Sequence, residues 1–343
     1  MVTKSLAVSE NARAERPAVI LANLGTPQAP TARAVRPFLR EFLSDRRIIE
    51  MPPAIWRPIL EGIILRVRPA RSAKLYESIW YTESNSSPLM YWSLRQRDEL
   101  AARLDHVADV HLAMRYGEPS IRSVLDQLRD QGVQRVLIIP AYPQYASSST
   151  APVIDEVARD MLKARNQLEI RTIRSFHDAP VYIEALAAAL VNHWDARGRP
   201  DFEGGDKLVL SFHSIPEAMH RDGDVYRDEC ETTAELLRSR LNLDPQWVLT
   251  RYQSVFGPAK WIGPATIDTM GELGAVGTTR VDVICPGFVA DCIETLDEIA
   301  RLNRDAFIEA GGSQFHYVPW GNDLPGCIDT FEEVARTGLA GWV

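Results

Sequence analysis

Cysteine is scarce in this sequence, and its few copies are widely spaced. The 343 residues hold four cysteines, Cys230, Cys285, Cys292 and Cys327, and no two of them are closer than seven positions. A CxxC pair is therefore absent, which disfavours a zinc or iron–sulfur site, and a chain of this length needs no disulfides to fold. We expect a protein of the reducing cytoplasm that carries no [2Fe–2S] cluster.

The sequence also lacks a basic excess, a long apolar run and a nucleotide-binding motif. Its 38 lysines and arginines are outnumbered by 46 aspartates and glutamates, so no nucleic-acid partner is expected. No apolar run approaches the length of a membrane span, and residues 1–16, which we interpret as a disordered lead-in, lack the apolar segment of a signal peptide. Neither GxGxxG nor a P-loop occurs, so NLGTP (23–27) indicates a tight turn.

What the sequence does contain is a regular alternation of short apolar runs with helical patterns. This alternation predicts parallel βαβ units, and the runs form two sets of four. The expected fold class is α/β, with two doubly wound Rossmann-like domains at 17–176 and 177–324, each a four-stranded parallel sheet flanked by helices. A C-terminal helix in 325–343 can pack back on the first domain. The expected strands are 18–24, 109–116, 135–143 and 169–176, then 207–214, 247–254, 281–288 and 315–320.

The run LVLSFHSIP (208–216) places a titratable side chain at the end of a buried strand. Its apolar residues are typical of a parallel strand buried on both faces, and Pro216 cannot continue a central strand. His213 therefore stands where the strand gives way to a loop, and ligands bind at these ends in open α/β sheets. The alternative is a core histidine with both ring nitrogens hydrogen-bonded.

An acidic helix follows a later strand of the same domain. At about 100° per residue, Asp291, Glu294 and Glu298 fall on one stripe of a helix in 291–310, which could bind or conduct a cation. The alternative is structural, because an aspartate with a glutamate three residues later resembles a capping box. Both interpretations remain open at this point.

Segment 52–69 combines apolar residues at helical spacing with arginines. We expect Pro58 to break or restart the helix and Pro69 to close it. The segment is either an amphipathic helix docked on its own core or an apolar lip that touches a membrane surface, aided by Arg71 and Lys74 just beyond it.

Two other strand ends offer side chains for a pocket. The loop AYPQYASSST (141–150) is rich in tyrosines and hydroxyls, and it can form a pocket wall, or Ser149 and Thr150 can cap the next helix. Arg115 and Tyr116 end the strand 109–116, where the arginine can pair internally or bind a carboxylate.

Taken together, the sequence blocks resemble one family, the ferrochelatases, and particularly its proteobacterial members. Nine blocks occur in order from about residue 17 to the end. Cys292 stands where animal members carry a histidine, and the cysteine-rich tail that holds a [2Fe–2S] cluster in some members is missing. The blocks are NLGTP (23–27), FLSDRRIIEMP (42–52), SPL (87–89), MRYGEPS (114–120), YPQYASSST (142–150), FHSIP (212–216), YQS with GP (252–258), Trp261 with Pro264, and PGFVADCIETLDEI (286–299).

The resemblance implies insertion of Fe²⁺ into protoporphyrin IX with release of two protons, the last step of heme biosynthesis. Iron is then a substrate, no cofactor is permanently bound, and the enzyme is cytoplasmic with peripheral contact at the inner face of the membrane. His213 and Glu294 map onto the catalytic and metal-binding positions, and Asp291 and Glu298 extend an acidic metal or proton path. The porphyrin-binding positions implied are Leu24, Arg115, Tyr116, Tyr142, Ser149, Thr150, Ser214 and Trp261.

Other functions remain open from the sequence. One is a chelatase for a different metal or tetrapyrrole, such as cobalt, nickel or coproporphyrin III, although the cobalt and nickel enzymes are expected to bring a second active-site histidine. Another is a two-lobed protein that carries heme or metal without turnover. A carrier needs no proton acceptor, so replacing His213 would distinguish it from an enzyme.

Overall fold

The computed structural model describes residues 16–257 and 259–343, which divide into two compact units. Unit 1 comprises the described chain up to Ala141, Ser148–Ser175 and Phe331–Val343, and unit 2 comprises Tyr142–Ser147 and Phe176–Thr330. The expected lead-in lies outside the described residues except for Arg16.

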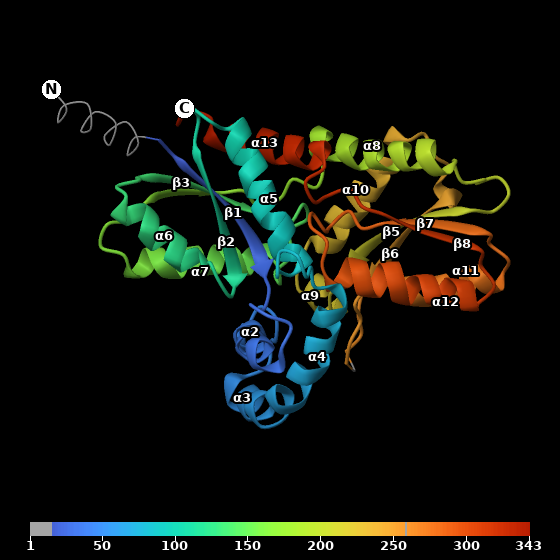
Figure 1. Ribbon diagram of the computed structural model, residues 1–343, viewed down its shortest axis with the longest axis horizontal. Helices are drawn as coiled ribbons and strands as arrows, with labels where there is room; N and C mark the ends of the chain where they lie inside the picture. The colour runs from blue at the N-terminus through green and yellow to red at the C-terminus, as the bar shows by residue number, and fades with distance from the viewer. Residues whose placement is uncertain (1–15, 258) are drawn as a thin grey trace. The chain divides into compact units, whose positions relative to one another are not determined.

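Unit 1 is built on a parallel sheet with the strand order β2-β1-β3-β4 (Figure 1). The central strand β1 pairs on both sides, Leu21 with Leu112 and with Ile139. A strand enclosed in this way needs apolar residues on both faces, as its sequence provides. All four predicted strands are confirmed, although β3 and β4 end earlier than expected. The strands are β1 (Ala18–Gly25), β2 (Asp109–Tyr116), β3 (Arg135–Pro140) and β4 (Glu169–Thr172).

Helices cover both faces of this sheet, α5 on one side and α6 and α7 on the other (Figure 1). The end of α13 packs closely on the strands, because a methyl group added at Gly338 would come within 2.7 Å of Leu137 Cδ2. These helices are α5 (Pro88–Arg103), α6 (Ile121–Asp130), α7 (Thr150–Lys163) and α13 (Pro325–Leu339).

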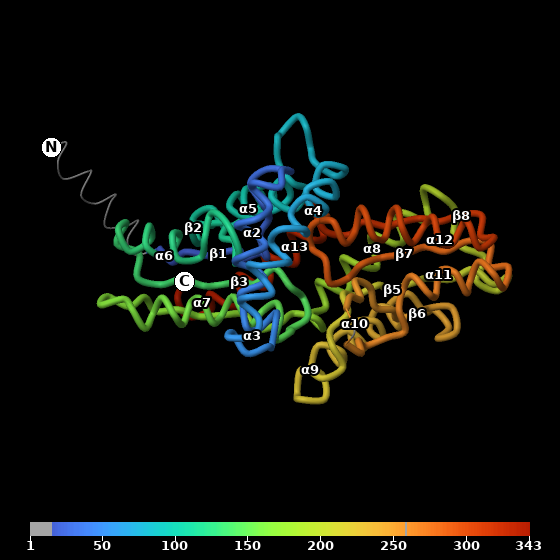
Figure 2. Tube along the Cα trace, turned by 90° about the horizontal axis from the view of Figure 1, so that it is seen from below, coloured from blue at the N-terminus to red at the C-terminus, as the bar shows by residue number. Residues whose placement is uncertain are grey.

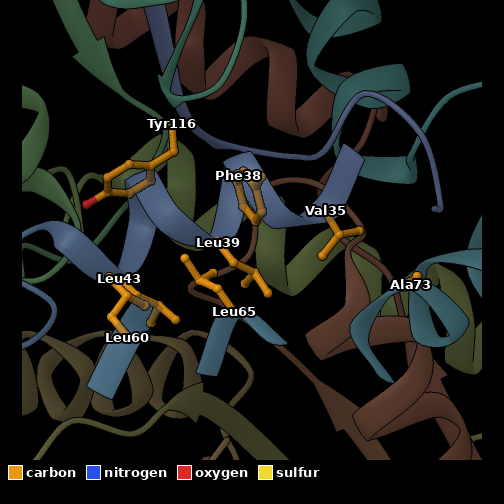
Figure 3. Packing of buried hydrophobic residues seen from close by; sticks show 8 residues of the cluster. All are labelled: Val35, Phe38, Leu39, Leu43, Leu60, Leu65, Ala73 and Tyr116. Atoms are coloured by element: carbon orange, nitrogen blue, oxygen red, sulfur yellow. The ribbon is translucent and has the colours of Figure 1, made fainter. Parts of the chain in front are cut away.

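A separate helical group follows β1 and has its own apolar core, drawn in Figure 3. The core includes Leu39 and Leu43 from the first helix, together with Leu60 and Leu65, which are 1% and 2% exposed. Trp56 Nε1 donates a hydrogen bond to the carbonyl of Leu43 at 2.6 Å and ties the second helix to the first. The group consists of α2 (Ala32–Ser44), α3 (Pro53–Ile59), the π-helical turn η1 (Leu60–Ile64) and α4 (Leu65–Ile79).

Segment 52–69 has both a buried face and an exposed apolar face. Ile55, Ile63 and Val67 are 55%, 60% and 69% exposed, on the same stretch as the buried Leu60 and Leu65. Pro58 lies inside α3, and the helical backbone continues without a break through η1 into α4, so the predictions that Pro58 breaks or restarts the helix and that Pro69 closes it are both wrong. Pro69 is the fifth residue of α4 and is buried inside the helix, which runs on to Ile79.

Unit 2 repeats the architecture with the strand order β6-β5-β7-β8. β5 is central and wholly buried from Leu208 to Phe212. The four predicted strands are again confirmed, and the expected α/β class with two four-stranded parallel sheets is correct. The strands are β5 (Lys207–His213), β6 (Val248–Gln253), β7 (Arg280–Ile284) and β8 (Gln314–Val318).

The unit 2 sheet lies between two helical layers. In Figures 1 and 2, α8 runs over β7 and β8, while α11 and α12 lie on the opposite face in Figure 1. Val281 and Val283 of β7 pack on that opposite face with Ile299 and Phe307. The elements are α8 (Pro180–Arg197), α9 (Glu217–Arg221), α10 (Tyr226–Arg240), the 3₁₀ turn η2 (Pro245–Trp247), α11 (Thr266–Ala275), the π-helix η3 (Glu294–Asn303) and α12 (Arg304–Glu309).

Among the described residues, no helix has both the length and the apolar character needed to cross a membrane. The four cysteines lie within the described ranges, are all buried, and form no disulfide.

Candidate active site

His213 is the last residue of β5 and projects where the strand ends. Its Nδ1 lies 2.6 Å from the carbonyl oxygen of Ser214. A carbonyl can only accept, so Nδ1 carries the proton and Nε2 keeps its lone pair. The ring is half-buried and meets the edge of Phe256 with centroids 6.2 Å apart. The structure therefore presents one basic nitrogen, with its tautomer fixed by the backbone.

The acidic helix after β7 is a π-helix, η3, over Glu294–Asn303. Its i→i+5 hydrogen bonds make a wider turn than an α-helix, and π segments often occur at functional sites. Glu294 and Glu298 lie on this helix, which follows β7, a direct neighbour of β5 in the sheet. The carboxyl ends of parallel strands meet at one edge, so both carboxylates belong to the same end of the sheet as His213.

Glu298 is held by the residue that follows β6. The Ser254 backbone N–H donates to Oε1 at 2.6 Å, and Ser254 Oγ donates to Oε2 at 2.5 Å. Ser254 has a φ of 65°, a left-handed conformation that is uncommon outside glycine. This conformation directs both donors of one residue to one carboxylate.

The pKa of Glu298 is raised above its usual value, and burial is the largest cause. The hydrogen bonds from Ser254 and the charge of His213 act in the opposite direction, while the charge of Glu294 raises the pKa further. His213, Glu294 and Glu298 are therefore close enough to interact electrostatically. A carboxylate of this kind accepts a proton more readily than an ordinary glutamate.

Glu294 begins η3 without serving as its cap. Thr295 Oγ1, not the Glu294 carboxylate, accepts the backbone N–H of Cys292 at 3.0 Å, and the carbonyl of Glu294 accepts a hydrogen bond from Gln253 Nε2 at 2.8 Å. Gln253 is itself fixed by Ser211 Oγ at 2.8 Å. The backbone at Glu294 is thus anchored to β5 and β6, and the metal-binding role of its carboxylate stays a prediction.

Asp291 is enclosed by donors. Its Oδ1 accepts hydrogen bonds from Thr295 Oγ1 at 2.8 Å and Tyr317 Oη at 2.7 Å, and its Oδ2 accepts one from Asn322 Nδ2 at 2.7 Å. The residue is 8% exposed. This arrangement indicates that Asp291 positions the start of the acidic helix, and its place in a metal or proton path stays a prediction.

In unit 1, Arg115 pairs with internal carboxylates, and its role as a propionate partner stays a prediction. Its Nη2 is hydrogen-bonded to Asp45, its Nη1 lies 4.0 Å from Glu41, and its side chain is 8% exposed. Tyr116 is fully buried and its hydroxyl donates to Asp45 at 3.0 Å. Arg115 and Tyr116 therefore share Asp45 as a common hydrogen-bond acceptor.

Among the other predicted porphyrin ligands, Ser214 is also structural, because it is fully buried and its Oγ donates to the carbonyl of Ile262 at 2.7 Å. Trp261 is half-buried, its Nε1 donates to the carbonyl of Phe256, and the two rings meet at 5.1 Å. Together with His213 they form an aromatic edge at the strand ends of unit 2.

The remaining predicted porphyrin ligands fall in both units. Leu24 is half-buried near the end of β1, and Ser149 precedes α7 without capping it through its side chain. Thr150 is fully buried. Tyr142 belongs to unit 2, whereas Leu24, Ser149 and Thr150 belong to unit 1.

Ser254 and Gln253 were missed as site residues. Both stand at the end of β6, next to the strand that carries His213, and His213 pairs with Gln253 in the sheet register. The signal available in the sequence was the position itself, a polar pair at the end of an apolar run.

The chain is similar to ferrochelatases over nearly its whole length. A family model described as ferrochelatase matches residues 16–339. Curated ferrochelatases from Neisseria meningitidis and Aromatoleum aromaticum are 47% and 49% identical, and the matches cover 95% and 96% of this chain and 95% and 89% of theirs.

Among solved structures, SirB from Bacillus subtilis with Fe³⁺ matches with a TM-score of 0.57 and 12% identity, over 94% of this chain and 96% of that chain. The sirohydrochlorin chelatase SirB of Bacillus subtilis subspecies spizizenii, in complex with cobalt, gives a TM-score of 0.51 at 12% identity, over 95% and 97%. At 12% identity these matches support the fold and carry no information on function.

Proposed function

The chain belongs to the ferrochelatase family and is a chelatase that inserts metal into a porphyrin, and we propose that Fe²⁺ and protoporphyrin IX are its substrates. The match to proteobacterial relatives supports this choice of substrates. The alternative of a carrier without turnover is disfavoured, because a carrier has no use for a fixed proton acceptor.

The observation that carries the proposal is the fixed tautomer of His213 beside two carboxylates. Two pyrrole protons must leave as the metal enters, so the site needs a base and a route away from it. Because Nδ1 is bound to the backbone carbonyl of Ser214, Nε2 is the ring nitrogen of His213 that can accept a proton or, in the neutral imidazole, ligate a metal.

In the proposed reaction, His213 Nε2 accepts one pyrrole proton and becomes an imidazolium. The carboxylate of Glu294 contacts the metal as it sheds water. Glu298, whose pKa is raised by burial, takes up a proton and passes it to solvent. Two protons leave, a dication enters, and the metalloporphyrin product has the same net charge at its centre as the free base.

We further propose that the exposed apolar residues of segment 52–69, Ile55, Ile63 and Val67, form a lip that contacts the porphyrin or a membrane surface. Both the proposed substrate and the product are apolar and partition into membranes, so an apolar surface can take up the one and release the other there. No permanently bound cofactor is part of the proposal.

The test is an anaerobic assay with purified protein, Fe²⁺ and protoporphyrin IX, followed by loss of free-porphyrin fluorescence. Parallel reactions use coproporphyrin III with Fe²⁺, and protoporphyrin IX with Co²⁺ or Ni²⁺. We expect the highest kcat/KM for Fe²⁺ with protoporphyrin IX. A higher value for coproporphyrin III would overturn the porphyrin assignment, and a higher value for Co²⁺ or Ni²⁺ would overturn the metal assignment.

A further inference from the structure

A second group of metal-ligating side chains lies in unit 2, apart from the candidate active site. One ligand atom from each of His193, Asp282 and His316 lies within 4.8 Å of the other two. Within residues 16–257 and 259–343, this is the one set of three such side chains that meets this criterion. None of the three was singled out by the sequence.

The position of this cluster separates it from His213. Asp282 of β7 pairs with Leu208 of β5 and with His316 of β8. Leu208 is five residues before His213 on the same strand, and a strand rises roughly 3.3 Å per residue. The backbone of His213 is therefore about 16 Å farther along β5 than the position that pairs with Asp282. The cluster therefore sits within the sheet, and the candidate active site sits at its carboxyl edge.

The cluster lies under the last turns of α8. Side chains alternate across a strand, so Asp282 faces away from the core that contains Val281 and Val283. Trp194 of α8 donates from Nε1 to Asp282 Oδ2 at 2.8 Å, which places α8 on this face. His193 precedes Trp194, and its ring meets that of His316 with centroids 5.0 Å apart.

The carboxylate of Asp282 is oriented in advance. It is fully buried, and Arg280 donates to Oδ1 from Nε at 2.8 Å and to Oδ2 from Nη2 at 2.9 Å. His316 Nδ1 lies 3.0 Å from Oδ1. Metal-ligating carboxylates and histidines are usually fixed by such outer hydrogen bonds, which set their orientation.

One ring nitrogen of His193 is left without a partner in the hydrogen-bond network around Asp282. Its Nε2 is buried and has no hydrogen-bond partner among the described residues. An unpartnered, buried imidazole nitrogen beside a carboxylate and a second imidazole is an arrangement that a metal ion would complete.

We propose that His193, Asp282 and His316 bind a divalent transition metal of the Zn²⁺ class. The ligands are His193 Nε2, one ring nitrogen of His316 and a carboxylate oxygen of Asp282, with water in the remaining position. To ligate, Asp282 releases one of the hydrogen bonds that it accepts from Arg280, Trp194 and His316. Two imidazoles and one carboxylate form a ligand set that suits Zn²⁺ and Fe²⁺, with an open position. The positive charge of Arg280 opposes a cation here, so binding is weaker than at a thiolate site.

The test is a Zn²⁺ titration of the full-length chain, stripped of metal and followed by calorimetry. His213→Ala serves as the background, because it removes binding by the candidate active site. We expect one Zn²⁺ per chain in this background, and a loss of affinity of at least tenfold when His193→Ala or His316→Asn is added. His316→Asn keeps a donor to Asp282 and removes the ring ligand, and His106→Ala, at a 94% exposed histidine, is the matched control.

Circular dichroism and melting of each metal-free variant establish that the fold is kept, and His193→Ala alone should insert metal at the wild-type rate. Absence of Zn²⁺ binding in His213→Ala, or unchanged binding after His193→Ala and His316→Asn, would overturn the proposal. The cluster would then be a hydrogen-bond network only.

Discussion

His213 and His220 form a natural comparison at the scale of single residues. Both are half-buried, and both have Nδ1 near a backbone carbonyl, at 2.6 Å from Ser214 and 3.1 Å from Asp224. Only His213 stands at a strand end beside Glu294 and Glu298. We expect His213→Ala to lower the rate of metal insertion by about 10² to 10⁴, the usual contribution of a general acid or base.

His220→Ala is the control and should keep the wild-type rate under the same anaerobic conditions, with thermal melting of both variants to show that they fold. A near-normal rate in His213→Ala would refute the assignment.

Glu294→Gln separates chemistry from helix capping. Because Thr295 and not Glu294 accepts the N–H at the start of η3, and Glu294 is anchored through its backbone carbonyl, the amide should leave the unfolding free energy unchanged within about 0.5 kcal/mol. Without a charge it can neither take up a proton nor attract the metal, so metal insertion should be far slower while porphyrin still binds. Glu309→Gln, on the exposed surface of α12, is the matched control.

The measurements are turnover, porphyrin fluorescence quenching and melting. Smaller defects, mainly in metal dependence, are expected for Asp291→Asn and Glu298→Gln. If Glu294→Gln inserted metal normally, His213 would need a different carboxylate partner.

Ser254→Ala should change the pH dependence of the reaction. The hydrogen bonds from Ser254 lower the pKa of Glu298 against the larger effect of burial, so removing Oγ should raise that pKa further. Glu298 must be deprotonated to accept a proton, and the acid limb of kcat/KM should therefore move to higher pH. The profile of Ser254→Ala is compared with that of Ser254→Ala/Glu298→Gln, in which this shift should disappear. A shift that persists in the double variant would assign it to another group.

The sequence identified these residues unequally, for physical reasons. His213, Glu294 and Glu298 follow buried strands, and the rule that ligands bind at strand ends made them candidates, whose roles stay predictions. Ser254 binds Glu298 because its backbone is left-handed, and the sequence pattern does not predict that conformation for a serine. The pairing of Arg115 with Asp45 could not be read from the sequence, which left an internal pair and a bound carboxylate both open, because Asp45 lies 70 positions away in the chain.

At the scale of elements, η3 shows what periodicity detects and what it misses. The apolar spacing of 291–310 predicts a helix there, and one exists as η3 and α12. The i→i+5 bonding of η3 was not predicted, because its apolar pattern also fits an α-helix over ten residues. The π-helical bonding of η1 was not predicted either, because the sequence on each side of it has the pattern of an ordinary α-helix.

Segment 52–69 carries a prediction at this scale, because its buried and exposed faces can be changed separately. Ile63→Ser/Val67→Ser alters side chains that are 60% and 69% exposed, so the unfolding free energy should change little. Binding to porphyrin or to vesicles should weaken if the exposed face is a lip.

Leu60→Ala, on the buried face, is the control and should cost about 2–5 kcal/mol in stability without a specific loss of binding. Vesicle sedimentation, porphyrin titration and melting distinguish the outcomes. Unchanged affinity for both partners in the exposed-face variant would remove the lip from the proposal.

At the scale of the whole molecule, the two parallel sheets were predictable because strands and helices alternate throughout. The two units cannot be separated by cutting the chain at one position, because each is made of more than one segment. Residues 142–147 belong to unit 2, and residues 331–343 belong to unit 1. Such exchanges depend on packing, for example of Gly338 against Leu137, and local pattern does not contain that information.

The cysteines carry the last prediction, which concerns the metal content of the whole chain. Burial is the largest cause that raises the pKa of Cys230, Cys285 and Cys292, so these side chains are thiols rather than the thiolates that bind iron–sulfur clusters. Each of them, and Cys327, is at most 8% exposed.

Anaerobically purified protein should therefore show no absorption from a cluster in the visible and near-ultraviolet range, and no acid-labile sulfide. Replacing all four cysteines with serine or alanine should leave the iron content unchanged. Stoichiometric iron with sulfide, lost in that variant, would show that the thiols do ligate a cluster.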